Sequence, residues 1–177
     1  MKIVKIILGV AIGSIILTGT GIGIWLGVRN TDLGIHPDDE WELMITGNII
    51  GDDFNLTLTE ITSMPYFEQG YIIKGSTTVE YVYRGVSISH LIANEIPVEA
   101  NATTITFVAI DQYEISFSIS ELTSDDANIL AYARNGQYLL NQTAGGNGYL
   151  RLIIPQTSED DFNGPSCLKW IVEIKIA

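Results

Sequence analysis

YRGVSISHLI, at Tyr83–Ile92, contains the clearest transition from strand to helix in this sequence of 177 residues. β-Branched and aromatic residues lead into it and predict a strand, and Gly85 is expected to break that strand. Ser87 then offers a hydroxyl that caps the N-terminus of a helix, and Ile88 and Leu91 share one face of the following turns. We therefore expect a strand that passes directly into a short amphipathic helix.

The segment upstream of this motif predicts strands and one short helix. Thr57 and Glu60 are spaced as a capping box, in which each side chain bonds the backbone N–H of the other residue. The helix should end before Pro65, because proline disfavours helical geometry at the residue that precedes it. The expected elements are a strand over Trp41–Gly47, a helix over Leu58–Ser63, and a strand pair over Tyr71–Lys74 and Thr78–Tyr83.

Hairpins dominate the pattern downstream. Asp111-Gln112 separates two alternating runs, and Asn135-Gly136 is the strongest short-range hairpin signal of the chain. Ser118 and Glu121 form a second capping-box pair. The expected strands are Thr103–Ile110, Tyr113–Ile119, Ala127–Arg134, Tyr149–Ile154 and Leu168–Ile176. Many short strands with a few helical turns predict one α+β, mainly β domain of mixed sheets over residues 41–177.

An uncharged run of 23 residues, Ile6–Val28, precedes this domain. As a helix it would be about 35 Å long, enough to cross a hydrocarbon core of roughly 30 Å. Lys2 and Lys5 lie before the run and acidic residues soon follow it, so the positive-inside rule keeps the N-terminus in the cytoplasm. We expect residues 1–29 to form a single-pass membrane anchor and 30–40 a polar stalk, with the domain outside the cell. A cleaved signal segment is the alternative.

The charge of the domain restricts its partners. Nine Lys and Arg residues stand against 21 Asp and Glu residues, and three of the nine cations, Lys2, Lys5 and Arg29, flank the apolar run. The remaining domain therefore has six cations and a formal charge of −15. Such a surface repels phosphate backbones, which argues against nucleic-acid binding. An extracytoplasmic protein partner or a small-molecule ligand stays open.

Three sequons and a single cysteine bear on compartment and metal binding. Asn55, Asn101 and Asn141 each begin an Asn-x-Thr sequon, a glycosylation acceptor wherever the domain meets that machinery. Cys167 is the only cysteine, which rules out an intrachain disulfide and any multi-cysteine zinc or iron–sulfur site. We expect Cys167 to be a small buried core residue, and we predict no metal site.

Six segments, in this order, resemble the oxidoreductase molybdopterin-binding domain, the fold of the catalytic core of sulfite oxidases. They are ELMITG with LTLTEITSMP, YRGVSISHLI, VAIDQY, ILAYARNGQYL, GGNGYLRLIIP and LKWIVEIKI, and they span residues 41–177. The resemblance implies a sulfite-oxidase-type fold and, in catalytic members, a molybdopterin cofactor that serves oxidoreductase chemistry. It also implies that the helix introduced by Gly85 and the loop before Arg151 lie beside that cofactor.

The chain departs from this family at the metal ligand. Catalytic members bind molybdenum through a cysteine thiolate just before the aromatic-x-Gly-Val motif, and the matching stretch here, GYIIKGSTTVEYVYRGV (70–86), contains no cysteine. Ser76 is a nearby side chain whose oxygen could replace the thiolate. By resemblance, Arg84, Gly85 and Arg151 are the other candidates for cofactor binding. Each arginine has the alternative of a structural ion pair with one of the many carboxylates.

Three functions remain open at this point. The missing thiolate and the scarce cations favour a non-catalytic binding or structural module that keeps the fold without the metal. We therefore expect no bound cofactor, while the family resemblance leaves molybdopterin open. A second hypothesis is a molybdopterin-dependent oxidoreductase with unusual ligation near Ser76, acting on a small oxygen-containing substrate and transferring electrons. The third is a cell-surface interaction domain that binds no pterin.

Overall fold

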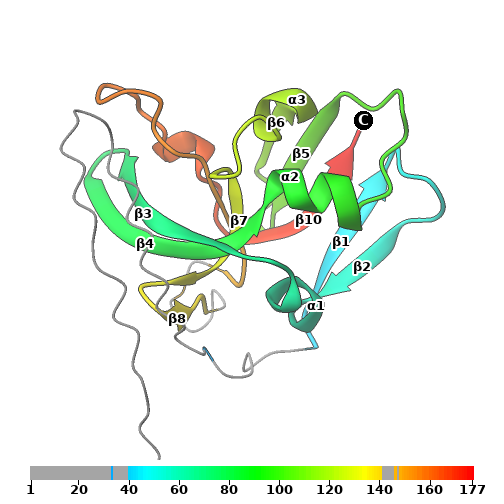
Figure 1. Ribbon diagram of the computed structural model, residues 1–177, viewed down its shortest axis with the longest axis horizontal. Helices are drawn as coiled ribbons and strands as arrows, with labels where there is room; N and C mark the ends of the chain where they lie inside the picture. The colour runs from blue at the N-terminus through cyan, green and yellow to red at the C-terminus, as the bar shows by residue number, and fades with distance from the viewer. Residues whose placement is uncertain (1–32, 34–39, 141–145, 147) are drawn as a thin grey trace, which may run out of the picture.

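The computed structural model describes residue 33, residues 40–140, residue 146 and residues 148–177. These residues form two sheets and several short helices (Figure 1), which confirms the predicted mainly β architecture. No helix in this part of the chain is long and apolar enough to cross a membrane. The expected anchor at 1–29 lies outside the described residues, as do most of the stalk and Asn141.

The first sheet brings the two ends of the domain together. Its strand order is β2–β1–β10–β5–β6. The β1–β10 pair is parallel, and the other three pairs of neighbouring strands are antiparallel. In β1, buried Leu43 and Ile45 alternate with exposed Met44, the period of a sheet with one covered face. The strands are β1 (Glu42–Gly47), β2 (Phe54–Thr57), β5 (Thr104–Ala109), β6 (Glu114–Ser118) and β10 (Ile171–Ile176).

The second sheet is built on a long hairpin. β3 pairs with β4, β4 pairs with β7, and β7 pairs on its other edge with both β8 and β9, all antiparallel. Asn135 and Gly136 have φ of 51° and 76°, the geometry of the predicted two-residue turn between β7 and β8. The strands are β3 (Phe67–Lys74), β4 (Thr78–Ser87), β7 (Ile129–Arg134), β8 (Gln137–Tyr138) and β9 (Arg151–Ile153).

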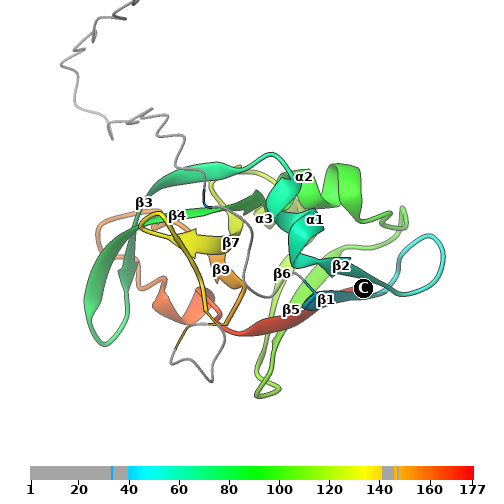
Figure 2. The same cartoon turned by 90° about the horizontal axis from the view of Figure 1, so that it is seen from below.

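Short helices cover the inner face of the first sheet. The capping box forms as predicted, because the Thr57 hydroxyl accepts from the Glu60 N–H at 3.1 Å and the Glu60 carboxylate accepts from the Thr57 N–H at 2.7 Å. Ile61 and Leu91 join the main core against this sheet, and Figure 2 shows α1 and α2 on one side of it. The helices are α1 (Leu58–Ser63), α2 (Ile88–His90) with a following π-helical turn (Leu91–Glu95), α3 (Ile119–Leu122) and a 3₁₀ turn (Gly164–Ser166).

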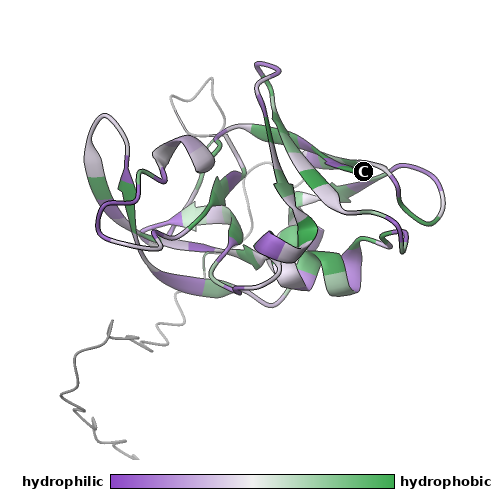
Figure 3. Cartoon of the chain, turned by 90° about the horizontal axis from the view of Figure 1, so that it is seen from above, coloured by the Kyte–Doolittle hydropathy of each residue, from purple (hydrophilic) through white to green (hydrophobic). Residues whose placement is uncertain are grey.

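A second, smaller core lies under the β3–β4 hairpin. Tyr71, Tyr83 and Ile153 pack there with Cys167, which is 4% exposed and is therefore a buried core residue, as predicted. Figure 3 shows hydrophobic residues along the strands and hydrophilic residues at the tips of several loops. The two cores meet at β7, where Ile129 and Ala131 belong to the smaller core and Leu130 and Tyr132 to the main one.

The prediction that Gly85 breaks its strand is wrong. β4 continues through Gly85 to Ser87, with a register irregularity between Arg84 and Gly85. A Cβ at Gly85 would lie 2.3 Å from the Leu130 carbonyl oxygen and 2.5 Å from the Ala131 Cα, closer than any side chain tolerates. Glycine is required here because two backbones touch, and not because the strand ends.

Replacing Gly85 by alanine should therefore be costly. Because the obstructing atoms of Leu130 and Ala131 belong to the backbone, we expect Gly85→Ala to lower the free energy of unfolding by about 2 kcal/mol. The matched control is Gly70→Ala in the neighbouring strand, where an added Cβ approaches only a Glu80 carboxylate oxygen, at 4.0 Å. Urea unfolding at unchanged m-value measures both changes. Equal stability of the two variants would contradict the close-contact explanation.

Candidate functional site

Three of the domain's six cations gather at one end of the second sheet. Arg134 ends β7, Arg151 begins β9, and Lys169 pairs with Arg151 through an isolated antiparallel bridge. Tyr83 connects Arg134 and Arg151, because it pairs with Arg134 in register and its hydroxyl accepts from Arg151. Desolvation lowers the pKa of Lys169, and the positive charges of Arg151 and Arg134 lower it further. We call Arg134, Arg151 and Lys169 the basic cluster.

Arg151 is the buried member of the basic cluster. The residue is 6% exposed, and its Nη1 donates to the Tyr83 hydroxyl at 3.0 Å. Its Nε is buried and has no hydrogen-bond partner in the described part of the chain. A buried guanidinium N–H without an acceptor is costly, and such a group is commonly satisfied by an ion or ligand.

No carboxylate neutralises the basic cluster within the described residues, where all ion pairs involve other cations. Instead, tyrosine rings line it: the Arg134 guanidinium lies 4.7 Å from the centre of the Tyr81 ring, and that of Arg151 lies 5.6 Å from the Tyr83 ring. Burial raises the pKa of Tyr83, and the charges of Arg151 and Arg134 oppose that rise. The arrangement suits an oxyanion such as a phosphate group, which guanidinium groups bind by paired hydrogen bonds.

The cluster lies beside the loop that ends at Arg151. Gly148 has φ of 82° and packs so closely on Trp170 that a Cβ would lie 2.5 Å from the Trp170 Cα. The Trp170 indole N–H donates to the Gly146 carbonyl oxygen at 3.1 Å. Trp170 itself follows Lys169, so these contacts hold the backbone next to two members of the basic cluster.

The four residues proposed from the sequence do not form one site. Arg84 pairs with Glu68 and stacks 4.4 Å over the Tyr66 ring, which is the structural alternative stated for it. Its predecessor Tyr83 faces Arg151, and successive residues of a strand point to opposite faces, so Arg84 lies on the other side of the sheet.

Ser76 and Gly85 do not join Arg151 either. Ser76 is remote from it, and Gly85 is explained by packing. Ser76 is exposed in the turn between β3 and β4, roughly 26 Å from Arg84 along an extended strand. Gly85 serves the contact with β7. Only Arg151 joins the basic cluster, and sequence reasoning missed Arg134 and Lys169. The small number of cations in the domain was the one sequence signal that could have directed attention to Arg134 and Lys169. No spacing pattern in the sequence links these two residues to Arg151.

Comparison with known proteins agrees with this fold. The profile of the family described as "Oxidoreductase molybdopterin binding domain" matches residues 29–177. The chain belongs to that family. Among solved structures, the sulfane dehydrogenase SoxCD from Paracoccus pantotrophus is similar, with a TM-score of 0.64 and 18% identity. The alignment covers 81% of this chain and 40% of that chain, so the domain spans less than half of that relative. No curated protein matches the sequence.

The residues of this molybdopterin-binding domain fit the anionic end of the family's cofactor and do not fit thiolate ligation of its metal. The unpaired Arg151 Nε and the uncompensated charge of the basic cluster suit a phosphate. The segment 70–86 has no thiol, and the Cys167 sulfur is buried and contacts the Ile154 N–H and carbonyl at 3.5 and 3.6 Å. Burial also raises the pKa of Cys167, which disfavours the thiolate. No three His, Cys, Asp or Glu side chains of the described residues are grouped to hold a metal ion.

Inorganic phosphate should stabilise the protein through Arg151. At a tenfold excess over its dissociation constant, a ligand of the folded state adds about 1.4 kcal/mol, which raises the midpoint of thermal unfolding by about 5 °C. We expect Arg151→Met to lose this shift. The control Lys175→Met removes a cation that pairs with Glu114 at 2.7 Å elsewhere in the domain, and should retain it. The measurement compares the midpoint of thermal unfolding in phosphate with that in chloride of equal ionic strength. If phosphate raises the midpoint of Arg151→Met as much as that of the wild type, the site is refuted.

Proposed function

We propose that this chain is a non-catalytic binding module of the molybdopterin-binding family, which holds the phosphate end of a pterin cofactor or a related anion at the basic cluster. The observation that carries the proposal is that three of six cations lie together in a domain of charge −15, and that one of them, Arg151, is buried with an Nε that has no hydrogen-bond partner among the described residues. Elsewhere this surface repels anions, so only a local concentration of positive charge attracts one.

The missing thiolate is the reason to propose binding without molybdenum chemistry. Thiolate is the soft anionic ligand that family members use, and the side chains of segment 70–86 offer only hydroxyl, phenol, amine, guanidinium and carboxylate groups in its place. Ser76 lies in an exposed turn, far along the hairpin from the basic cluster. An oxidoreductase that uses Ser76 is therefore the second candidate, and the following measurement separates it from the first.

Elemental analysis and pterin analysis of the natively purified full chain test the proposal together. The chain should be produced in a host that makes the cofactor, and assayed for molybdenum, tungsten and pterin fluorescence after oxidation. We expect pterin that is lost in Arg151→Met and retained in Lys175→Met, with molybdenum and tungsten far below one per chain. Stoichiometric metal would overturn the non-catalytic assignment and direct attention to Ser76→Ala. Absence of pterin would overturn the cofactor part of the proposal.

The proposal also places the domain outside the cell on a single N-terminal membrane helix. It is supported by the uncharged run Ile6–Val28 and the lysines before it, and the exposed sequon residues Asn55 and Asn101 are compatible with that compartment. Alkaline phosphatase fused after Ala177 should be active, because this enzyme folds only outside the cytoplasm. The fusion should stay in the membrane pellet after alkaline carbonate washing. Release by the wash would indicate a cleaved signal, and an inactive fusion would refute the orientation.

A further inference from the structure

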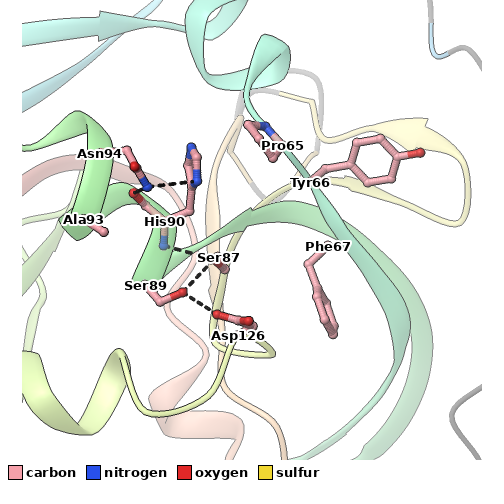
Figure 4. Close-up of a pocket in the computed structure, with 9 residues that line it drawn as sticks. All are labelled: Pro65, Tyr66, Phe67, Ser87, Ser89, His90, Ala93, Asn94 and Asp126. Carbon is pink, nitrogen blue, oxygen red and sulfur yellow. Dashed lines mark hydrogen bonds between the residues drawn. The ribbon is translucent and has the colours of Figure 1, made fainter.

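A second concave site, distinct from the basic cluster, lies where α1 leads into β3. It has a volume of about 410 Å³ and opens between that connection and the start of α2 (Figure 4). One wall is proline and aromatic, and the other is polar. The lining residues are Pro65, Tyr66, Phe67, Ser87, Ser89, His90, Ala93, Asn94 and Asp126.

The hydroxyl protons of the polar wall are already used. Ser89 donates its only hydroxyl proton to the Asp126 carboxylate. Ser87 and Ser89 oxygens are 3.0 Å apart, so Ser87 must be the donor in that pair. The Ser87 oxygen also accepts the backbone N–H of His90 at 3.1 Å. The chain of hydrogen bonds therefore runs from His90 N–H through both serines to Asp126, as Figure 4 shows, and it leaves no hydroxyl proton for a ligand.

The side-chain amide protons on this wall are used as well. Asn94 directs its NH₂ group to the His90 carbonyl oxygen at 3.1 Å and to His90 Nδ1 at 3.2 Å. Because an amide nitrogen only donates, Nδ1 accepts, and the ring proton is on Nε2. That nitrogen lies 3.3 Å from a Glu95 carboxylate oxygen and has no hydrogen-bond partner among the described residues, but it is buried and so does not open into the pocket.

What remains on the polar wall is a set of hydrogen-bond acceptors with a negative charge. These are the second carboxylate oxygen of Asp126, a lone pair of Ser89 and the Asn94 carbonyl oxygen, none of which has another partner among the described residues. The nearest cation on the aromatic side, Arg84, is paired with Glu68. We infer that this pocket binds an organic cation rich in N–H donors, an alkylguanidinium or alkylammonium group, from a small molecule or from an arginine or lysine side chain of a protein.

Other ligand classes fit the pocket less well. An anion would be repelled by the Asp126 carboxylate, and the side-chain protons of Ser87, Ser89 and Asn94 on that wall already have acceptors. A divalent metal ion takes six or more oxygen ligands or a tetrahedral set, and the pocket offers one carboxylate. The stem of an alkylguanidinium matches the apolar wall formed by Pro65 and Phe67, while its head matches the acceptors.

Binding of butylguanidinium to the full chain in a non-ionic detergent tests this inference, with ¹H–¹⁵N NMR as the readout. We expect saturable shifts at the amides of Ser89, His90 and Asp126. Butylurea, which has the same shape without the charge, should bind about fivefold more weakly, the effect expected for one partly exposed charge pair. Asp126→Asn should weaken butylguanidinium similarly, and its amide oxygen can still accept from Ser89, so the fold is preserved.

The matched control is Asp160→Asn, which removes an exposed carboxylate in a loop that does not line the pocket. It should bind butylguanidinium as the wild type does. A blocked peptide with one arginine separates the two sources: if it binds at least as tightly as butylguanidinium, a protein side chain is the ligand, and if it does not bind, the ligand is a small molecule. Equal binding of butylurea, or an unchanged affinity in Asp126→Asn, would overturn the inference. Neither result depends on the basic cluster.

Discussion

The backbones of β4 and β7 touch at Gly85, and much of the domain depends on that contact. With no side chain there, the Leu130 carbonyl oxygen occupies the space a Cβ would need, and β4 stays paired as far as Ser87. Ser87 then caps α2 through the His90 N–H. α2 contributes Ile88 and the π-helical turn contributes Leu91 to the main core. One close backbone approach therefore couples the second sheet to the helices that cover the first.

The same contact positions the basic cluster. Ala131 pairs with Gly85 on one side and with Arg151 on the other, so the three residues form a row across β4, β7 and β9. Arg151 enters the sheet at a place where tyrosine and aliphatic side chains surround it. A charge held there without a carboxylate destabilises the isolated domain. Its retention is physically reasonable when a ligand supplies the missing negative charge, a common compromise between stability and binding.

Net charge alone is a poor guide to the ligands of this domain. The whole surface is strongly acidic, yet Arg134, Arg151 and Lys169 have no acidic neighbour within ion-pair distance among the described residues, while Arg84 and Lys175 are paired. The field near a ligand depends on groups within a Debye length of about 8 Å and is stronger where side chains exclude water. The domain therefore presents a positive group at Arg151 and a set of acceptors at Asp126, and the two proposals assign ligands of opposite charge to them.

Local sequence determined the local structure of this protein. The Thr57–Glu60 capping box and the Asn135-Gly136 turn formed as predicted, because each depends on hydrogen bonds or φ values within four residues. The order of motifs also carried the family resemblance, and the predicted burial of Cys167 is confirmed. Long-range pairing was different: the role of Gly85, the parallel pairing of β1 with β10, and the meeting of Arg134, Arg151 and Lys169 depend on residues far apart in the chain. Arg84 and Arg151 looked alike in sequence, and only strand pairing, which sends successive side chains to opposite faces, gave one a carboxylate partner and left the other unsatisfied.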